Sequence, residues 1–468
     1  DSGASDLIDK FLNDLDREHG SFKQLRGHVK GSFAVALWPK TSGEPGVMVA
    51  VALDDPAGAE SIVAGLSDPE SIGSMKYYKP KDGGMAVTFF DGYAIVATDP
   101  SLAQLAIRTA KGENPSLNSS ASFKAARASL PDDASLMYFI NGDAIAKADE
   151  KTRKGYAALG ITETGWSAGS VTLTSEGIQI DSYQPAVAGN GLLGSLAKTA
   201  PLGYKSLDRF PAGAVGVMGW SNLGTFAESM LKYFSSMPEG KDVSEGIAKM
   251  EKETGTSLEN DWIPAFRGET YFAFYPPMDG NKDPGLVLSV DNSNGGSATK
   301  FLKMMIDKAN AGRFDHSGEH VRFAESASGD LDLYTPSPKP GDDTEARLAI
   351  SDSQAMLIVG SSLIGKVTSP NQKLLSSEGL KSFATGDPAK FRLQVDLYAV
   401  IDMIDKMGEL PKDVNLRQIL SGRNLTATGT WETDAAKGTV VIPINVPELI
   451  RVLGKKAKES DERSIAMR

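Results

Sequence analysis

An internal duplication is the feature that most constrains how this 468-residue chain can fold. Residues 25–54 and residues 266–291 present the same features in the same order. Each has an Arg-Gly pair near its start, an apolar run that ends in proline, a turn with Pro-Gly, and a second apolar run. Two runs rich in strand-forming residues, broken by proline and glycine, predict a β-hairpin in each segment.

The correspondence continues along the chain. Residues 91–96 match residues 352–357, and the predicted strand at residues 136–141 matches the one at residues 391–396. A predicted helix follows each hairpin and each of these later strands. The insertions fall between the elements, which is where a duplicated unit tolerates variation in its loops.

The duplication predicts an α+β chain of two tandem homologous domains. We assign residues 1–188 to the first copy, residues 189–210 to a junction and residues 211–468 to the second copy. Each copy is expected to hold a mainly antiparallel sheet built from hairpins, with helices packed on one face.

The two copies differ at their starts. The second copy opens with a predicted strand at residues 214–219, and Ser221 or Asn222 then caps a helix. The matching apolar stripe of the first copy already stands at residues 7–15, so the first copy lacks its first strand. A sheet without that strand has an unpaired edge or a gap. We therefore expect a longer precursor; the alternative is that the two copies simply differ at their ends.

Composition excludes several classes of function. The chain has no cysteine, which removes disulfides, thiolate metal sites and cysteine nucleophiles. Its formal charge of −11 argues against nucleic acid, for which a basic face supplies most of the affinity. No apolar run approaches the roughly 18 residues of a membrane-spanning helix. The absence of cysteine and a start without methionine favour an extracytoplasmic protein processed from a longer precursor.

A strand that follows a Leu-Pro or Phe-Pro pair occurs at residues 130–141 and 210–215, and Gly-Tyr-Ala-Ile-Val-Ala-Thr-Asp stands at residues 92–99. In these patterns the chain resembles the bacterial domain-of-unknown-function family 3352. The resemblance implies an α+β fold and an exported or membrane-anchored setting. It implies no activity and supplies no catalytic residues. The chain departs from the family in lacking the usual N-terminal anchor and the first strand.

Two glycine-rich motifs match functional patterns. Residues 165–169, Gly-Trp-Ser-Ala-Gly, fit a serine-hydrolase elbow, but the elbow needs a following helix and residues 170–174 predict a strand. Residues 189–194 fit a dinucleotide-binding motif, yet Pro185 separates them from the preceding strand. Because 48 glycines produce such matches by chance, we assign no catalytic serine and interpret residues 189–194 as part of a flexible junction.

Two weak metal-binding candidates remain. His316 and His320 would share one face of a helix, but Ser317-Gly318 favours a polar loop instead. We interpret both as surface histidines.

The other candidate is the alternating series Asp279, Asn281 and Asp283, which is similar to the start of a calcium loop. Pro284 and Val290 occupy the positions at which such a loop requires glycine and glutamate. A solvated hairpin turn is the simpler interpretation. We therefore assign no catalytic, cofactor-binding or metal-binding residue and no cofactor.

The C-terminal residues 448–458 predict an amphipathic helix. Its apolar side would dock on its own domain or, alternatively, on a partner or a membrane surface.

These observations favour a non-enzymatic extracytoplasmic protein that serves as a structural or accessory subunit of a bacterial envelope or membrane-associated assembly. It would act through protein partners or self-assembly, with a membrane tether in the missing N-terminal segment as a further expectation. The basis is the shortage of catalytic chemistry, since no nucleophile is paired with a base and no closed metal site is apparent. The alternative is a periplasmic carrier that binds a lipid or another apolar ligand.

Overall fold

The computed structural model describes residues 28–38, 46–65, 67–79, 85–145, 150, 153, 165–185, 191–235, 240–278, 283–292, 295–314, 320–337, 345–407 and 415–452. The chain divides into two compact units, each described here by itself. The first unit comprises residues 1–125 and 143–153, and the second comprises residues 126–142 and 154–468.

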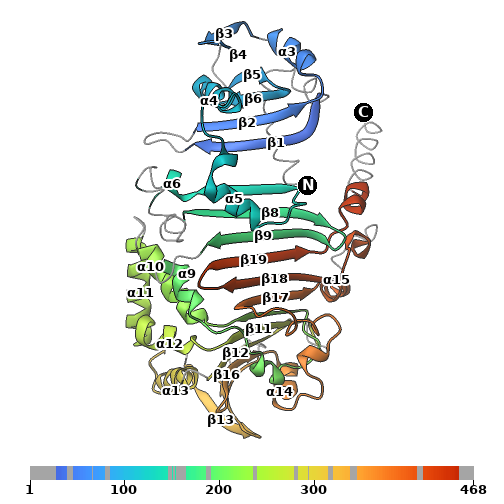
Figure 1. The fold of residues 1–468 in the computed structure, drawn as a ribbon. Coiled ribbons are helices and arrows are strands. Elements are labelled where there is room, and N and C mark those ends of the chain that lie inside the picture. The colour runs from blue at the N-terminus through green and yellow to red at the C-terminus, as the bar shows by residue number, and fades with distance from the viewer. Residues whose placement is uncertain are drawn as a thin grey trace, which may run out of the picture. The chain divides into compact units, whose positions relative to one another are not determined.

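The first unit contains a six-stranded antiparallel sheet in the order β1-β2-β6-β5-β4-β3 (Figure 1). Its strands are β1 (Val29–Trp38), β2 (Gly46–Leu53), β3 (Pro69–Ile72), β4 (Met75–Tyr78), β5 (Ala86–Phe90) and β6 (Tyr93–Ala97). The helices of this part of the chain are α3 (Pro56–Ala64), α4 (Pro100–Ala110), η1 (Leu117–Ser119), α5 (Ala121–Ala128) and α6 (Gly142–Ile145).

Helix α4 covers one face of this sheet. It begins at Pro100, and the side chain of Asp99 accepts a hydrogen bond from the Ser101 amide at 2.8 Å, which satisfies a free donor of the first turn. Ala103 and Ile107, one turn apart, are buried against sheet residues that include Ile95. The capping residue and the apolar residues that face the sheet are therefore both encoded locally, within residues 99–107.

The second unit contains a thirteen-stranded antiparallel sheet in the order β13-β14-β15-β16-β12-β11-β10-β17-β18-β19-β9-β8-β7. Its strands are β7 (Leu136–Asn141), β8 (Trp166–Thr174), β9 (Gly177–Pro185), β10 (Gly216–Trp220), β11 (Thr270–Tyr275), β12 (Gly285–Asp291), β13 (Phe323–Ser328), β14 (Leu331–Pro336), β15 (Ala346–Ile350), β16 (Gln354–Val359), β17 (Phe391–Asp396), β18 (Asn424–Trp431) and β19 (Ala435–Ile442). Its helices are α9 (Gly191–Ala197), η2 (Lys205–Arg209), α10 (Leu223–Ser235), α11 (Gly240–Thr254), η3 (Leu258–Trp262), α12 (Ile263–Ala265), α13 (Ser297–Asn310), α14 (Ser361–Thr368), η4 (Leu374–Ser376), α15 (Leu397–Lys406) and η5 (Leu416–Ile419).

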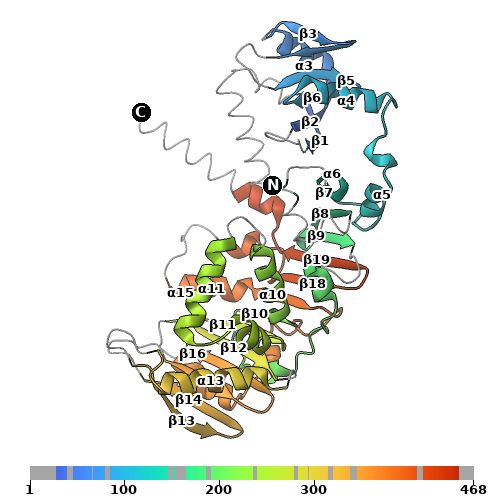
Figure 2. The ribbon, with the colours of Figure 1, turned by 90° about the vertical axis from the view of Figure 1, so that its left-hand side faces the viewer.

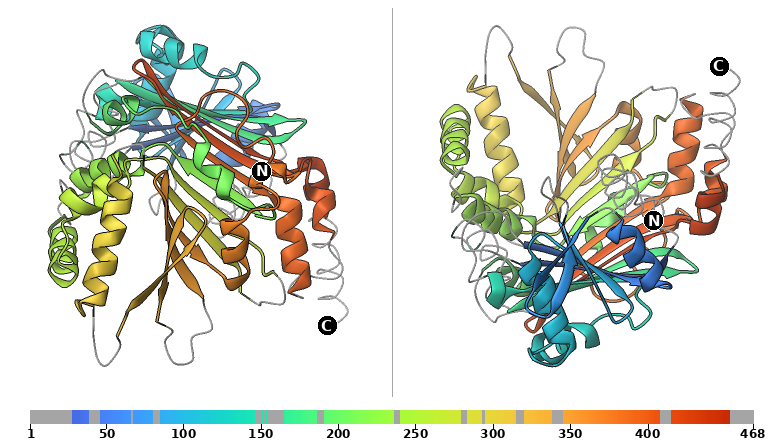
Figure 3. Two further views of the ribbon diagram at one scale, coloured as in Figure 1. Left: turned by 90° about the horizontal axis from the view of Figure 1, so that it is seen from below. Right: turned by 90° about the horizontal axis from the view of Figure 1, so that it is seen from above.

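Helical elements pack on both faces of the larger sheet, so the prediction of helices on one face is wrong for this unit. On one face, Val287 and Ile358 pack with Leu363 of α14. On the other face, Val290 packs with Ala298 of α13. Figure 3 shows the yellow helix α13 to one side of the strands and the orange helices to the other. The reason is that strands such as β12 carry apolar residues at successive positions, so both of their faces need cover.

The observed fold confirms the predicted mixed α+β class with antiparallel sheets. Strands β7, β8 and β9 lie within residues 1–188, yet they extend the larger sheet because β9 pairs with β19. The predicted first copy therefore contributes strands to both sheets.

The described part of the junction, residues 191–210, contains two short helical segments. Helix α9 begins at Gly191, and Leu196 within it is buried. Leu207 of η2 is also buried and belongs to the main core of the second unit. At the other end of the chain, residues 446–452 are helical, and the remainder of the predicted C-terminal helix lies outside the described residues.

Helices α10 and α11 lie side by side (Figure 2), and α10 carries an ion-pair centre at Glu228. Its carboxylate accepts from Lys232 Nζ at 2.7 Å and from Arg267 Nη2 at 3.1 Å. These hydrogen bonds, that of Lys232 first, hold the pKa of Glu228 below its ordinary value. Such a carboxylate contributes stability above its unfolded pKa and loses it as the pH falls through the lower folded pKa.

We therefore expect Glu228→Gln to lower the free energy of unfolding by up to about 1 kcal/mol at neutral pH. Below the pKa that Glu228 has in the folded protein, the substitution should leave the free energy of unfolding unchanged. Urea denaturation at both pH values measures this. Glu245→Gln is the control, because its pair with Lys241 spans 3.6 Å between exposed side chains and should matter at neither pH. A loss that persisted in acid would contradict the assignment.

Candidate functional site

The structure describes only some of the weak metal-binding candidates of the sequence, and they stay predictions. His316, Asp279 and Asn281 lie outside the described residues, while His320 and Asp283 are exposed. Within the described parts of the chain, no group of three or more His, Cys, Asp or Glu residues could hold a metal ion.

The serine of the elbow-like motif lies within a strand. Ser167 is the second residue of β8, it is buried, and it stands opposite Ile140 of β7. A nucleophile elbow instead holds its serine at a sharp turn between a strand and a helix. The backbone at Ser167 therefore does not have the geometry that this motif requires.

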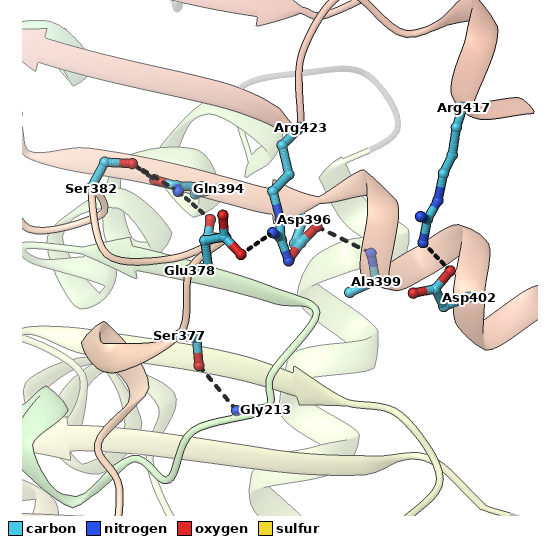
Figure 4. Close-up of polar contacts among 11 residues, drawn as sticks. Gly213, Ser377, Glu378, Ser382, Gln394, Asp396, Ala399, Asp402, Arg417 and Arg423 are labelled. Atoms are coloured by element: carbon cyan, nitrogen blue, oxygen red, sulfur yellow. Dashed lines mark hydrogen bonds and ion pairs between the residues drawn. The ribbon is translucent and has the colours of Figure 1, made fainter.

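A polar cluster of the second unit is centred on Asp396 at the end of β17 (Figure 4). The carboxylate is almost fully buried, with 5% of its side chain exposed. One oxygen accepts from the Ala399 amide at 3.1 Å and caps α15. The other accepts from Arg423 Nε at 2.9 Å and from Arg423 Nη2 at 2.7 Å, so two guanidinium nitrogens pair with one carboxylate oxygen.

Arg423 extends the cluster toward the loop before β17. Its Nη1 atom lies 2.9 Å from Glu378, and its guanidinium lies 5.9 Å from the ring of Tyr398. The hydrogen bonds from Arg423 to Asp396 are the main reason that the pKa of Arg423 is raised. Arg423 therefore stays charged and holds β18, α15 and this loop together.

Gln394 holds the same loop from inside the sheet. It donates to the Gly379 carbonyl at 2.6 Å, and its amide group also contacts the Ser382 hydroxyl. Ser377 accepts from the Gly213 amide at 3.1 Å, which links the loop to the chain before β10 (Figure 4). Since these groups bind one another, the arrangement positions a helix and a loop rather than presenting a nucleophile.

Arg417 and Asp402 form a second ion pair beside the cluster (Figure 4). Both side chains are about half exposed, so this pair is worth little in free energy.

Strand β1 of the first unit is an exposed apolar strand. Every residue of β1 except Ala36 is exposed, although its sequence is predominantly apolar. Phe33, Val35 and Leu37 alternate along one face and are 49%, 56% and 67% exposed. Because alternate residues share a face of a strand, these three side chains form one apolar row.

Strand β1 is also an edge strand: among the described residues it pairs only with β2. Its register shifts between Val29 and Phe33, and from Phe33 to Trp38 the pairing is regular. Natural edges are usually protected by charge, proline or a bulge. The bulge protects the first residues of β1, but residues 33–38 contain neither charge nor proline.

The described residues contain no helix that is long and apolar enough to span a membrane.

Comparison with known proteins yields one family. The model of the family DUF3352, described as a protein of unknown function, matches residues 71–321. No curated protein matches the chain. A solved structure titled "Structure of crystal form IV of TP0453" is 14% identical, over 50% of this chain and 77% of that one, with a TM-score of 0.23. Since the family model spans more than half of the 468 residues, this chain belongs to the DUF3352 family.

Proposed function

We propose that this protein is a duplicated, non-enzymatic subunit with a structural or accessory role in a bacterial envelope or membrane-associated assembly, and that it works outside the cytoplasm. The observation that carries the proposal is the exposed apolar edge at β1. An apolar strand edge of this kind promotes association with another chain.

Strand order supports the duplication. In the first unit the order is β1-β2-β6-β5-β4-β3, and part of the larger sheet runs β11-β12-β16-β15-β14-β13. The two series are the same if each label of the second is lowered by ten. A shared order of six strands that includes one crossover is difficult to explain without common descent of the two copies.

Hairpin register supports it as well. In the first hairpin, Trp38 stands opposite Gly46 and Leu37 opposite Val47. In the second, Tyr275 stands opposite Gly285 and Phe274 opposite Leu286. Both hairpins thus pair an aromatic residue with the glycine that follows the Pro of the turn. These pairs define position-by-position counterparts, of which Leu37 and Phe274 are one.

Native purification tests the proposed role. We expect the full chain, purified under mild conditions from the membrane fraction of its source, to retain a protein partner at fixed stoichiometry. Quantitative mass spectrometry measures the ratio, and crosslinking identifies the contact. A chain that purifies alone, or that retains a lipid in place of a protein, would contradict the role; the lipid would favour the carrier alternative.

A further inference from the structure

We propose that strand β19 is self-complementary, and that two molecules of this chain join their β19 strands about a two-fold axis at Thr439 when β9 leaves that edge. The partner is therefore a second copy of this chain. This inference deepens the proposed function and rests on its duplication, because it treats β9 and β19 as counterparts.

Strands β9 and β19 occupy the same place in two equivalent hairpins. In the hairpin of β8 and β9, Thr174 stands opposite Gly177 across a turn of two residues. In the hairpin of β18 and β19, the Glu432 amide donates to the Ala435 carbonyl at 2.8 Å, again across two residues. Aligning the two turns relates the hairpins by a constant offset of 258 residues, the separation of Asp181 and Thr439.

The two counterpart strands pair with each other in the sheet (Figure 1). They run antiparallel, and Asp181 stands opposite Thr439, its own counterpart. The next pair on one side is Ser182 with Gly438, and on the other side the counterparts of these two residues pair with each other, in exchanged strands. This is the pattern that a two-fold axis produces, and the axis passes through the pair of Asp181 and Thr439.

The strand on the outer edge of β19 thus indicates what else fits there. Strand β9 covers this edge over eight residue pairs, and β9 is the counterpart of β19 itself. A two-fold interface uses the same surface on both sides. A second β19 can therefore take the place of β9 in the same register, with main-chain hydrogen bonds supplying the affinity.

The side chains of β19 suit this pairing. Thr439 would stand opposite Thr439 of the second molecule, and threonine pairs across antiparallel strands are favourable. Lys437 is the one charged residue of β19, and it would stand opposite Val441 of the second molecule. Like charges would therefore not meet across the axis.

Strand β9 is not self-complementary. Two β9 strands paired about the same axis would place Asp181 opposite Asp181, and like charges directly opposite each other are destabilising. Within the chain, Asp181 instead accepts from Thr439 Oγ1 at 2.8 Å and from Gln179 Nε2 at 2.8 Å. Asp181 thus favours the pairing of β9 with β19, and it restricts self-association of an opened molecule to the β19 edge.

Release of β9 is required for the dimer. A strand in the same chain acts at an effective concentration on the order of millimolar, far above that of a second molecule in a dilute solution. While β9 is in place, a second copy does not compete. Once β9 is released, two β19 edges form a closed two-fold dimer, because each edge is used once.

The test begins with two independent ways of releasing β9 in the full chain. One is Gly177→Ala, at the start of β9. The other is Gln179→Pro together with Ile180→Pro, because successive amides of a central strand point to opposite neighbours and one of these two therefore donates to β19. Hydrogen–deuterium exchange measures the release as lost protection of β19, and circular dichroism confirms that the chain is folded.

Disulfide trapping then locates the axis, and the absence of cysteine makes an introduced thiol unique. We expect Thr439→Cys to form a disulfide-linked dimer at least about tenfold faster in the released chain than in the chain with β9 in place. Val440→Cys is the matched control. Its thiols would lie on a diagonal, with Cα atoms about 7–8 Å apart, so it should crosslink at least about tenfold more slowly than Thr439→Cys.

Asp181→Thr tests the restriction to one edge. In the chain released by Gly177→Ala, this change removes the charge that keeps β9 from pairing with itself. We expect association to continue beyond the dimer, because both edges are then self-complementary. Analytical ultracentrifugation should show dimers of the Gly177→Ala chain and larger species of the double variant; dimers of both would show that Asp181 imposes no restriction.

The remaining outcomes separate this inference from the proposed function. Equal crosslinking by Thr439→Cys and Val440→Cys would overturn the inference, and so would a β19 that stays protected in both release variants, since no second copy could then reach its edge. If the released chain does not dimerise while native purification yields a protein partner, the inference falls and the proposed function stands. If it dimerises in register and no native partner is found, the inference stands and the proposed function falls.

Discussion

Replacing Gly177 by alanine is expected to lower the free energy of unfolding of the second unit by at least about 4 kcal/mol and to open the sheet between β9 and β19. A loss of this size would be a large part of the about 5–15 kcal/mol that stabilises a typical domain. Gly177 begins β9, the strand through which β8 and β7 are connected to the rest of the larger sheet.

Two features of Gly177 produce this effect. Its φ angle is +133°, a conformation that residues with a side chain rarely adopt. A Cβ atom there would collide with the carbonyl oxygen of Ile442 and lie 2.7 Å from the Ile444 nitrogen. Both obstacles are backbone atoms, which cannot rotate away as a side chain would. The turn is also held in place, because the Ser421 hydroxyl donates to the Glu176 carbonyl at 2.6 Å.

Urea denaturation measures the loss, and hydrogen–deuterium exchange locates it in the eight residue pairs between β9 and β19. Gly213→Ala is the matched control, because Gly213 has a φ of +98° but nothing within 4 Å of its Cβ position. That variant should lose only about 1–2 kcal/mol, the cost of the backbone conformation alone. Equal losses for the two variants, or unchanged protection of β19, would show that the collision is relieved elsewhere.

The sequence predicted the hairpins well because their signals are local. At residues 25–54 and 266–291, apolar runs, Pro-Gly turns and the helices that follow are all readable within a few residues.

The arrangement of the sheets was not predictable in the same way. The pairing of β9 with β19 joins residues at least 250 positions apart, and no pattern within either strand specifies a partner. Helices on both faces were missed because a short apolar run such as β12 does not reveal how many of its faces are buried. Within the junction, the glycines at residues 189–194 gave no indication that the leucines after them, such as Leu207, belong to a core.

The Asp396 cluster was missed although one signal pointed to it. An aspartate at the end of a strand and three residues before Ala399 is a plausible helix cap, and it could have been assigned as one. Its ion pair with Arg423 could not, because the two residues are 27 positions apart and meet only when β17 and β18 align.

Removal of the Asp396 carboxylate should be the most costly polar change in the described part of the second unit. We expect Asp396→Ala to lower the free energy of unfolding by about 2–4 kcal/mol, because it removes a helix cap and leaves the Arg423 charge without its buried partner. This range lies below the usual cost of breaking a fully buried pair, since Arg423 is 33% exposed and retains Glu378.

Two further variants separate the contributions. Asp396→Asn keeps an oxygen that can accept from the Ala399 amide, so it should lose about half as much as Asp396→Ala and preserve the first turn of α15. Asp402→Ala removes the exposed carboxylate of α15 that pairs with Arg417 of η5, and it should cost less than about 1 kcal/mol. Urea denaturation gives the three values, and hydrogen–deuterium exchange reports the first turn of α15. If Asp402→Ala proved as costly as Asp396→Ala, burial of the Asp396 carboxylate would not be the source of the effect.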